Sequence, residues 1–348
     1  MKAIQLLILT LLLGCAGAKY DRGVVPFAEA NRDVQMRQFP FEGEQVTMVV
    51  GVRAGSAHDP VGQEGLAWLT AQHLKNGGGL GDRIAGLGGR ISVDVEDELV
   101  FFKLEIAGSK SASAVQVLVE AFTEPVYSAD GLERLQAEGL QWLDEGLGSS
   151  EARLAEAAFQ QWVYQGHPYG HASQGRSGVL GTLDIDDIKH FFERRYIRPA
   201  IAVAHTGNLP EEAANAVRSG LSQRPATLYS DVTPRPIAPV NDTQVMAVLK
   251  EGTVPGVLLG HPVNVQVGEV DWAALILGRA AIEPSATLDR LMGSGLIQKS
   301  VSLWFSADNS QSAEALVSDA VAGVSRWVDQ GIDPQTFEDT RDRLLSAI

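Results

Sequence analysis

The sequence predicts an α+β protein that contains two related domains, and three observations support this fold class. Apolar, β-branched stretches with a strand pattern alternate with amphipathic stretches that have the helical period. Residues 225–240 carry four prolines, a density that is typical of a linker between domains. The order of strand-like and helix-like stretches after this linker repeats the order before it, which indicates a duplicated domain.

The chain divides into five predicted segments. They are a lipoprotein signal peptide at 1–14, a polar tether at 15–33, a first domain at 34–224, a proline-rich linker at 225–240 and a second domain at 241–348. The second domain is much shorter than the first, and its last residues stop inside a helical pattern. We therefore expect the second domain to be incomplete.

The first domain begins with a strand, a helix and a hairpin. Residues 44–55 are apolar and β-branched enough for a buried strand. The stretch from about Glu64 to Lys75 has a helical pattern and ends at glycines that supply C-cap conformations. Residues 91–108 alternate as two strands around an acidic turn. The glycine-rich stretch 77–89 lacks the ending of a phosphate-binding loop, and we expect a mobile loop there.

Further elements follow in the same alternating order. Residues 111–165 have helical patterns, and residues 183–196 predict another amphipathic helix with Asp184 as its N-cap. A strand is expected at 200–208. The second domain has strand patterns within 243–263 and at 299–307, and helical patterns at 270–283 and 312–331.

The charge balance restricts the classes of partner. The chain has 28 Lys and Arg against 43 Asp and Glu, which gives a formal net charge of −15. Such a surface repels phosphate backbones, so the composition argues against nucleic acid as a partner. An acidic exterior favours either basic peptides or no specific partner.

The N-terminus has the pattern of a secretory signal. Lys2 precedes an apolar run that is too short to remain in a bilayer as a spanning helix. The run ends at Cys15, the only cysteine of the chain, and its context resembles a bacterial lipobox, in which the cysteine becomes the lipidated first residue. We expect a lipid-anchored protein of the cell envelope, at the outer membrane and facing the periplasm. A plain signal peptide with an incidental cysteine is the alternative.

Three short motifs occur in order along the first domain. They are the helix entry Glu64-Gly65-Leu66-Ala67, the Gly-His-Pro-Tyr-Gly loop at residues 166–170, and a Tyr-x-x-Pro step at Tyr196 and Pro199. Together they resemble the insulinase/pitrilysin family of zinc metallopeptidases, most closely its bacterial members similar to the mitochondrial processing peptidase. The resemblance covers about residues 40–345. It implies two homologous insulinase-like domains, each an antiparallel-rich sheet with helices packed on one face.

The resemblance also implies that the zinc motif of the family is lost. In active members the helix after Gly-Leu-Ala carries His-x-x-Glu-His, in which two histidines bind zinc and the glutamate takes a proton from the zinc-bound water. Trp68, Ala71 and Gln72 stand at those three positions. We therefore expect a non-catalytic member that has no catalytic residue and binds no zinc.

Three residues are remnant candidates for a metal site. Glu138 and Glu145 lie two helical turns apart and match the supporting and ligand glutamates that the resemblance implies. The alternative is that both are ordinary solvated helix residues, because a metal site needs a full set of ligands. His73 lies one residue beyond the required position, so it would point about 100° away from Gln72 on an ideal helix. The alternative for His73 is an interaction with the last carbonyls of its helix.

The substrate-binding strand of the family also differs in this chain. The resemblance implies Asn-Ala on an edge strand that receives the substrate backbone, and Ser92-Val93 stand there instead. Because main-chain hydrogen bonds do not depend on side-chain identity, this edge can still accept an extended peptide.

These observations lead to one leading function and two alternatives. The resemblance implies a catalytically inactive lipoprotein that acts as the non-catalytic partner of an active insulinase-family subunit, which would carry the intact zinc ligands. The first alternative is a stand-alone scaffold or peptide-binding lipoprotein of the envelope. The second is an active metallopeptidase with displaced ligands, which would use His73 and Glu145.

Overall fold

The computed structural model describes residues 34–41, 43–226, 255–263, 288–292, 299–306 and 312–346, with isolated positions between 246 and 281. The predicted signal peptide, the tether with Cys15 and nearly all of the proline-rich linker lie outside these residues. So do the first strand pattern of the second domain and most of its first helix. No helix in the described part of the chain is both long and apolar enough to cross a bilayer.

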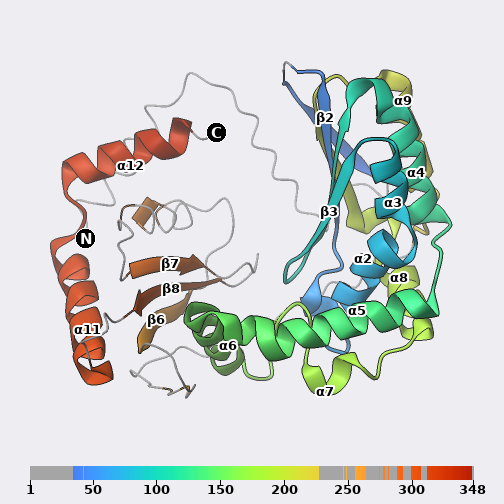
Figure 1. Cartoon of the computed structure of the whole chain (residues 1–348). Helices are drawn as coiled ribbons and strands as arrows, with labels where there is room; N and C mark the ends of the chain where they lie inside the picture. The colour runs from blue at the N-terminus through green and yellow to red at the C-terminus, as the bar shows by residue number, and fades with distance from the viewer. Residues whose placement is uncertain are drawn as a thin grey trace. The chain divides into compact units, whose positions relative to one another are not determined.

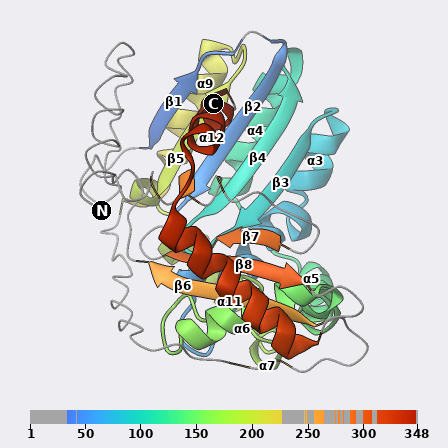
Figure 2. The same cartoon turned by 90° about the vertical axis from the view of Figure 1, so that its left-hand side faces the viewer.

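The part of the chain predicted as the first domain contains a five-stranded sheet with the order β1-β5-β2-β4-β3 (Figure 2). Its strands are β1 (Gln35–Phe39), β2 (Gln45–Val52), β3 (Arg90–Val95), β4 (Val100–Ala107) and β5 (Ile201–Thr206). All neighbouring strands run antiparallel except β1 and β5, which are parallel. The predicted hairpin is confirmed, because Val95 of β3 pairs with Val100 of β4 at its closed end.

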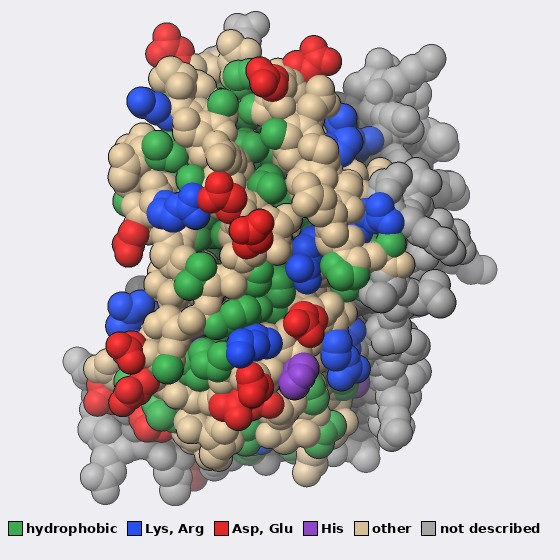
Figure 3. Space-filling view, turned by 90° about the vertical axis from the view of Figure 1, so that its right-hand side faces the viewer, with side chains coloured by type: hydrophobic (Ala, Val, Ile, Leu, Met, Phe, Trp, Pro, Cys, Tyr) green, Lys and Arg blue, Asp and Glu red, His purple; other side chains and the backbone are tan. Residues whose placement is uncertain are grey.

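Helices cover one face of this sheet. The helices of this part of the chain are α2 (Leu66–Gln72), α3 (Leu80–Gly86), α4 (Ser111–Thr123), α5 (Ala129–Gln141), α6 (Glu151–Val163), α7 (Ser177–Leu180), α8 (Ile185–Arg195) and α9 (Glu211–Leu221), of which α6 contacts β6 (Gly256–Val263) rather than this sheet. Figure 1 shows α2, α3, α4, α8 and α9 on the same side of the sheet. The sheet residues that face them alternate with more exposed ones, as the period of a strand requires. On the outer side of these helices, charged side chains of both signs are interspersed with apolar ones (Figure 3).

A local sequence signal explains the start of α8, and burial explains why α3 forms. The Asp184 side chain accepts hydrogen bonds from the backbone N–H groups of Asp186 and Asp187, and the Asp187 carboxylate accepts one from the Asp184 backbone N–H. This capping box confirms the predicted start of α8. The expected loop at 77–89 was wrong, because Leu80–Gly86 form α3. Leu80 and Ile84 lie one turn apart and are buried, so their burial offsets the low helix propensity of the glycines around them.

The described residues of the predicted second domain include a three-stranded antiparallel sheet with the order β6-β8-β7. Its described elements are β6 (Gly256–Val263), β7 (Leu288–Met292), β8 (Lys299–Ser306), α11 (Ala313–Gln330) and α12 (Pro334–Ser346). Helix α11 contacts β6 and β8. In both sheets an antiparallel strand pair is followed by a helix that packs on the sheet, so the predicted α+β fold class is confirmed.

A close backbone contact holds the start of α2. Gly65 has a φ of 105° and Gly175 a φ of 90°, both in the left-handed region that favours glycine. A Cβ atom on Gly175 would lie 2.0 Å from the carbonyl oxygen of Glu64, and a Cβ atom on Gly65 would lie 2.5 Å from that of Gln174. The chain segments 64–65 and 174–175 can therefore touch only because both positions are glycine.

This contact can be tested by substitution. We expect Gly175→Ala to lower the free energy of unfolding by at least about 2 kcal/mol, because the methyl group meets backbone atoms and the residue keeps a strained φ. Gly178→Ala is the matched control, since no atom lies within 4 Å of its Cβ position. This control should be neutral or slightly stabilising in denaturant unfolding. Equal stability of the two variants would contradict the contact.

Candidate functional site

A buried carboxylate fixes the N-terminus of α2. Oδ2 of Asp59 accepts a hydrogen bond from the backbone N–H of Gly65, and Oδ1 accepts one from that of Ala67, both at 2.7 Å. These two donors belong to the first turn of the helix, where backbone N–H groups have no helical partner. Burial raises the pKa of the Asp59 carboxyl well above its ordinary value, and the two N–H donors oppose that shift. Nε2 of His171 lies 4.0 Å from Oδ2 of Asp59.

Packing side chains occupy the motif positions on α2. Ala71 has no exposed surface and belongs to the core between the helix layer and the sheet. Trp68 is half-buried and covers Gly139 of α5, where an added Cβ would lie 2.9 Å from Cζ3 of the indole. Gln72 is also half-buried, and its Oε1 accepts a 3.5 Å hydrogen bond from Asn76. None of these three groups is a zinc ligand of the kind found in peptidases.

His73 is buried. The sequence analysis gave an interaction with the last carbonyls of its helix as the alternative, but the ring contacts another segment instead. Its Nε2 accepts a 3.0 Å hydrogen bond from the backbone N–H of Ser128, in the segment that leads into α5. The ring stacks on Tyr127 at 6.0 Å between centroids. The helix widens here into a π turn, His73–Gly77, and burial lowers the pKa of the imidazole. The neutral ring uses its acceptor nitrogen to join two helices of the fold.

Glu138 and Glu145 are exposed on the α5 segment. Glu138 forms an ion pair with Arg134 one turn earlier, with 3.8 Å between Nε and Oε1. Glu145 lies in the π turn Trp142–Gly146 that continues α5, and its Oε2 accepts a 3.2 Å hydrogen bond from Gln141. Each glutamate is thus paired with a neighbour on its own helix, in contact with solvent.

The donor atoms near α2 and α5 do not fit a zinc ion. The acceptor nitrogen of His73 is used by a backbone donor, and no second histidine lies on α2. Among the described residues, no three His, Cys, Asp or Glu side chains are close enough together to hold a metal. A zinc site needs three protein ligands in tetrahedral geometry, so we derive no metal-dependent step for this helix pair.

The predicted substrate edge lies on β3, which is the last strand of its sheet. Ser92 pairs with Lys103 and Val93 with Phe102, both on the β4 side. Both side chains are partly exposed. Within the described residues, the other side of β3 pairs with no strand, so β3 is an edge strand of this sheet.

The Gly-His-Pro-Tyr-Gly loop contacts the turn of the β3–β4 hairpin. The hydroxyl of Tyr169 donates a hydrogen bond to Oε1 of the buried Glu98 in that turn. Nδ1 of His167 accepts a 3.1 Å bond from the Tyr169 backbone, and both rings pack with Tyr164. The sequence had indicated the loop but not the role of Glu98, which lies in an acidic turn that resembles any solvated turn.

A second buried histidine precedes α2. His58 is buried, and its Nδ1 lies 3.3 Å from the carbonyl oxygen of Gly55. Burial and the positive charges of Arg195 and Arg53 lower the pKa of His58 to about 3. Its imidazole is therefore neutral in the folded protein at any physiological pH.

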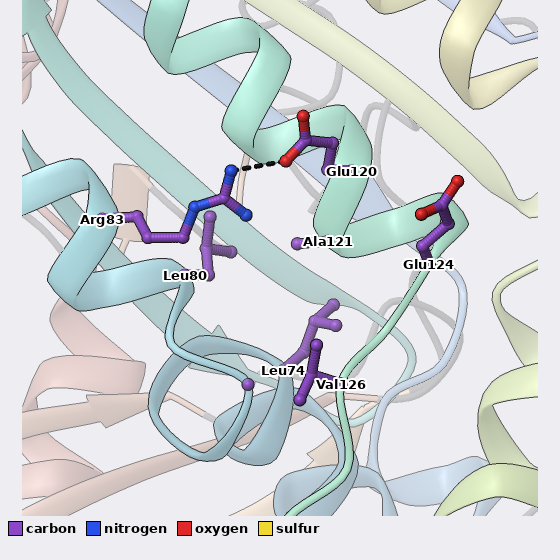
Figure 4. A pocket seen from close by; sticks show the side chains of 8 residues that line it. Leu74, Leu80, Arg83, Glu120, Ala121, Glu124 and Val126 are labelled. Atoms are coloured by element: carbon purple, nitrogen blue, oxygen red, sulfur yellow. Dashed lines mark hydrogen bonds and ion pairs between the residues drawn. The ribbon is translucent and has the colours of Figure 1, made fainter.

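A small pocket lies between the π turn after α2, α3 and the end of α4 (Figure 4). Leu74, Leu80 and Val126 form its apolar wall, and the ion pair between Arg83 and Glu120 lies at its rim. Its volume of about 170 Å³ is below that of a typical small-molecule site. We assign no ligand to it.

Because Ala71 is buried, a larger charged side chain at this position should destabilise the fold. Ala71→Glu, which places the carboxylate of the family motif at this position, should lower the free energy of unfolding by at least about 2 kcal/mol through overpacking and an unpaired buried charge. Gln72→Glu, at the half-exposed neighbour, should change it by less than about 0.5 kcal/mol. Denaturant unfolding of both variants measures the difference. A stable Ala71→Glu variant would mean that α2 retains room for a catalytic glutamate.

The pKa of His58 predicts a pH dependence of stability. Between pH 6.5 and 3 the unfolded chain binds a proton at His58 that the folded protein does not. The free energy of unfolding should therefore fall as the pH falls from 6.5, by up to about 1.4 kcal/mol per unit from this residue. Between pH 6.5 and 5, the free energy of unfolding of His58→Gln should change less steeply with pH than that of the unmodified protein. The free energy of unfolding of Gly175→Ala should be lower throughout but should change with pH as steeply as that of the unmodified protein. An unchanged slope in His58→Gln would contradict the assignment.

Comparison with known proteins gives structural matches alone. No protein-family model and no curated protein sequence matches the chain. An inactive domain of peptidase M16 from Pseudomonas fluorescens has a TM-score of 0.70 at 18% identity, over 92% of this chain and 82% of that chain. A protease from Helicobacter pylori has a TM-score of 0.79 at 14% identity, over 91% and 83%. The first half of the periplasmic protease PqqL from Escherichia coli has a TM-score of 0.67 at 12% identity, over 91% and 75%.

These matches share one architecture. At such identities a likeness establishes the fold and leaves the activity open. The chain therefore has the insulinase-like α+β fold of M16-like peptidases.

Proposed function

We propose that the chain is a catalytically inactive insulinase-like protein that acts as the non-catalytic partner of an active zinc metallopeptidase. The observation that carries this proposal is the set of residues at the zinc-motif positions of α2. Its zinc-motif positions hold the packing residues Trp68 and Ala71 and the amide of Gln72, and Ala71 is fully buried. A helix of this kind contributes to the stability of the domain and offers no ligand pair to a metal.

The retained architecture supports a partner role. The sequence has residues that position α2, including Asp59 and the two glycines Gly65 and Gly175. It also keeps the hairpin that carries the open edge of β3. A chain that no longer cleaves peptides has a reason to keep this edge if it still helps to hold an extended substrate for a catalytic subunit.

The open edge of β3 also favours a second candidate function. A stand-alone lipoprotein that binds extended peptides in the envelope would use the same edge at Ser92 and Val93. The two functions differ in whether an active subunit is needed for any effect on a peptide. An active peptidase with displaced ligands has less support, because His73 and Glu145 each have a structural partner.

The location of the protein belongs to the same proposal. We infer a lipid anchor at Cys15 that would hold the domains at the outer membrane, facing the periplasm, where a peptidase partner would meet them. This inference rests on the lipobox-like sequence alone.

Reconstitution tests the partner role. The chain would be produced together with an insulinase-like chain of the same organism that carries an intact His-x-x-Glu-His motif, and hydrolysis of a fluorogenic peptide would be measured. We expect this chain alone to be inactive and the pair to be at least about tenfold more active than the catalytic chain alone, because the substrate is positioned by both subunits.

One control and one contradicting outcome complete the test. Replacing the motif glutamate of the catalytic chain by glutamine should abolish the activity of the pair, which would locate the chemistry in that chain. If the catalytic chain is fully active alone and this chain changes nothing, the partner role is wrong and the stand-alone binding function is favoured.

A further inference from the structure

The loop at residues 170–176 packs on the start of α2 through buried ionisable side chains. A turn within this loop is closed by a 2.8 Å hydrogen bond from the N–H of Gly175 to the carbonyl oxygen of Ala172. Nε2 of His171 lies 4.0 Å from Oδ2 of Asp59. The Asp59 side chain has no exposed surface, and that of His171 is 7% exposed. We call Asp59 and His171 the buried pair.

The other ring nitrogen defines the tautomer of His171. Nδ1 lies 2.9 Å from the carbonyl oxygen of Ala172, and a carbonyl oxygen can only accept a hydrogen bond. Nδ1 therefore carries a proton. In the neutral imidazole Nε2 then has none, so the pair brings an acceptor nitrogen towards the carboxylate of Asp59. The contact becomes attractive once one proton lies on either group.

The charges around the buried pair are unbalanced without this proton. In the described part of the chain, His171 is the one basic side chain at ion-pair distance from Asp59. Glu64 and Arg176 also act on the pair, but they lie 3.9 Å from each other and their charges offset. His58, the chain neighbour of Asp59, is neutral. A buried carboxylate without a cation is costly, and such a group takes up a proton or gains a charged partner.

We infer that the buried pair holds one proton when the loop is packed on α2, on Nε2 of His171 or on Oδ2 of Asp59, and that pH thereby controls this contact. A proton on Nε2 makes an ion pair, and a proton on Oδ2 makes a neutral hydrogen-bond donor. Loss of the proton leaves a buried carboxylate beside an acceptor nitrogen and favours release of the loop. This inference concerns the contact between the loop and α2 and does not depend on the partner role proposed above.

The pKa directions of the two groups agree with a single bound proton. Burial raises the pKa of Asp59, against the effect of its two N–H donors, so the last proton is held firmly. Burial lowers the pKa of His171, against the effects of the Ala172 carbonyl and of Glu64, so a second proton is resisted.

The direction of the pH effect follows from the proton count. When the loop is open, both groups are in water and titrate near their ordinary values, about 3.9 for Asp and about 6.5 for His. The open pair thus holds one proton between these values and none above about pH 6.5. Packing of the loop takes up a proton above that pH, so its equilibrium constant should fall by up to about tenfold per pH unit.

Hydrogen exchange of the full chain tests the inference. The backbone N–H groups of Gly65 and Ala67 are bonded to Asp59, so they exchange when the buried pair opens. Exchange would be measured by mass spectrometry between about pH 5.5 and 9 and corrected for the intrinsic amide rate at each pH, which gives the opening constant. The first turn of α8, capped by the exposed Asp184, is the internal reference.

The expected result is specific to α2. Its opening constant should be flat between about pH 5.5 and 6.5 and should rise by up to about tenfold per unit between about pH 7.5 and 9. The reference turn of α8 should show no such rise. An opening constant at α2 that is independent of pH, or that rises only as that of α8 does, would overturn the inference.

Matched substitutions assign the effect to the buried pair. The side chain of Asp59→Asn cannot release a proton in this range, so the opening constant at α2 should differ by less than about twofold between about pH 7 and 9. Asp184→Asn makes the same change at the exposed cap of α8 and should keep the pH dependence at α2. A dependence at α2 that persists in Asp59→Asn would contradict the inference.

The imidazole gives a second readout that needs no variant of Asp59. In the NMR spectrum of the unmodified chain, the His171 ring, identified by the loss of its signal in His171→Gln, should show no titration near its ordinary midpoint of about 6.5. The reason is that the buried pair keeps one proton across that pH. A titration of His171 with this ordinary midpoint would refute the single shared proton.

Discussion

The buried carboxylate of Asp59 is the interaction on which the first domain depends. It accepts two hydrogen bonds from the first turn of α2 and thereby fixes where that helix starts and how it lies on the sheet. The contact between Gly65 and Gly175 holds the same point from the other side. Because α2 is fixed at its first turn, the positions of Trp68, Ala71 and Gln72 follow from the helical period alone.

The residues that hold the elements in place and the residues at the positions of the family motif differ in physical role. Asp59 accepts hydrogen bonds from the first turn of α2, Gly65 allows a close backbone contact, and Tyr169 donates a hydrogen bond to the β3–β4 turn. At the positions that would bind a metal, the chain has side chains that pack, such as Trp68 over Gly139. Stability of the fold needs the first group and gains from the second, whereas catalysis would need neither Trp68 nor Ala71. The fold is thus compatible with a role in binding and assembly.

Much of this could be predicted from the sequence because the signals were local. The hairpin, the capping box at Asp184 and strands β2, β5, β6 and β8 rest on alternation and cap residues, and the structure contains them, whereas β1 and β7 were not predicted. Helix α3 was missed because glycines dominate its sequence, and only the burial of Leu80 and Ile84 in the tertiary fold makes it a helix. The role of His73 was also missed, since its partner Ser128 is distant in the chain. Contacts of that kind leave no periodic signal in one sequence.

The central claim is that α2 is a packed structural helix and not a metal site. The zinc content of the purified protein tests this claim most directly. The full chain would be purified, exposed to excess zinc, dialysed and analysed for zinc per polypeptide by elemental analysis. The account predicts a value near zero, because the residues around α2 do not supply three ligands. A value near one zinc ion per chain that is lost in both His73→Ala and Glu145→Ala would contradict it. Such a result would show that the π turn after α2 brings displaced ligands together.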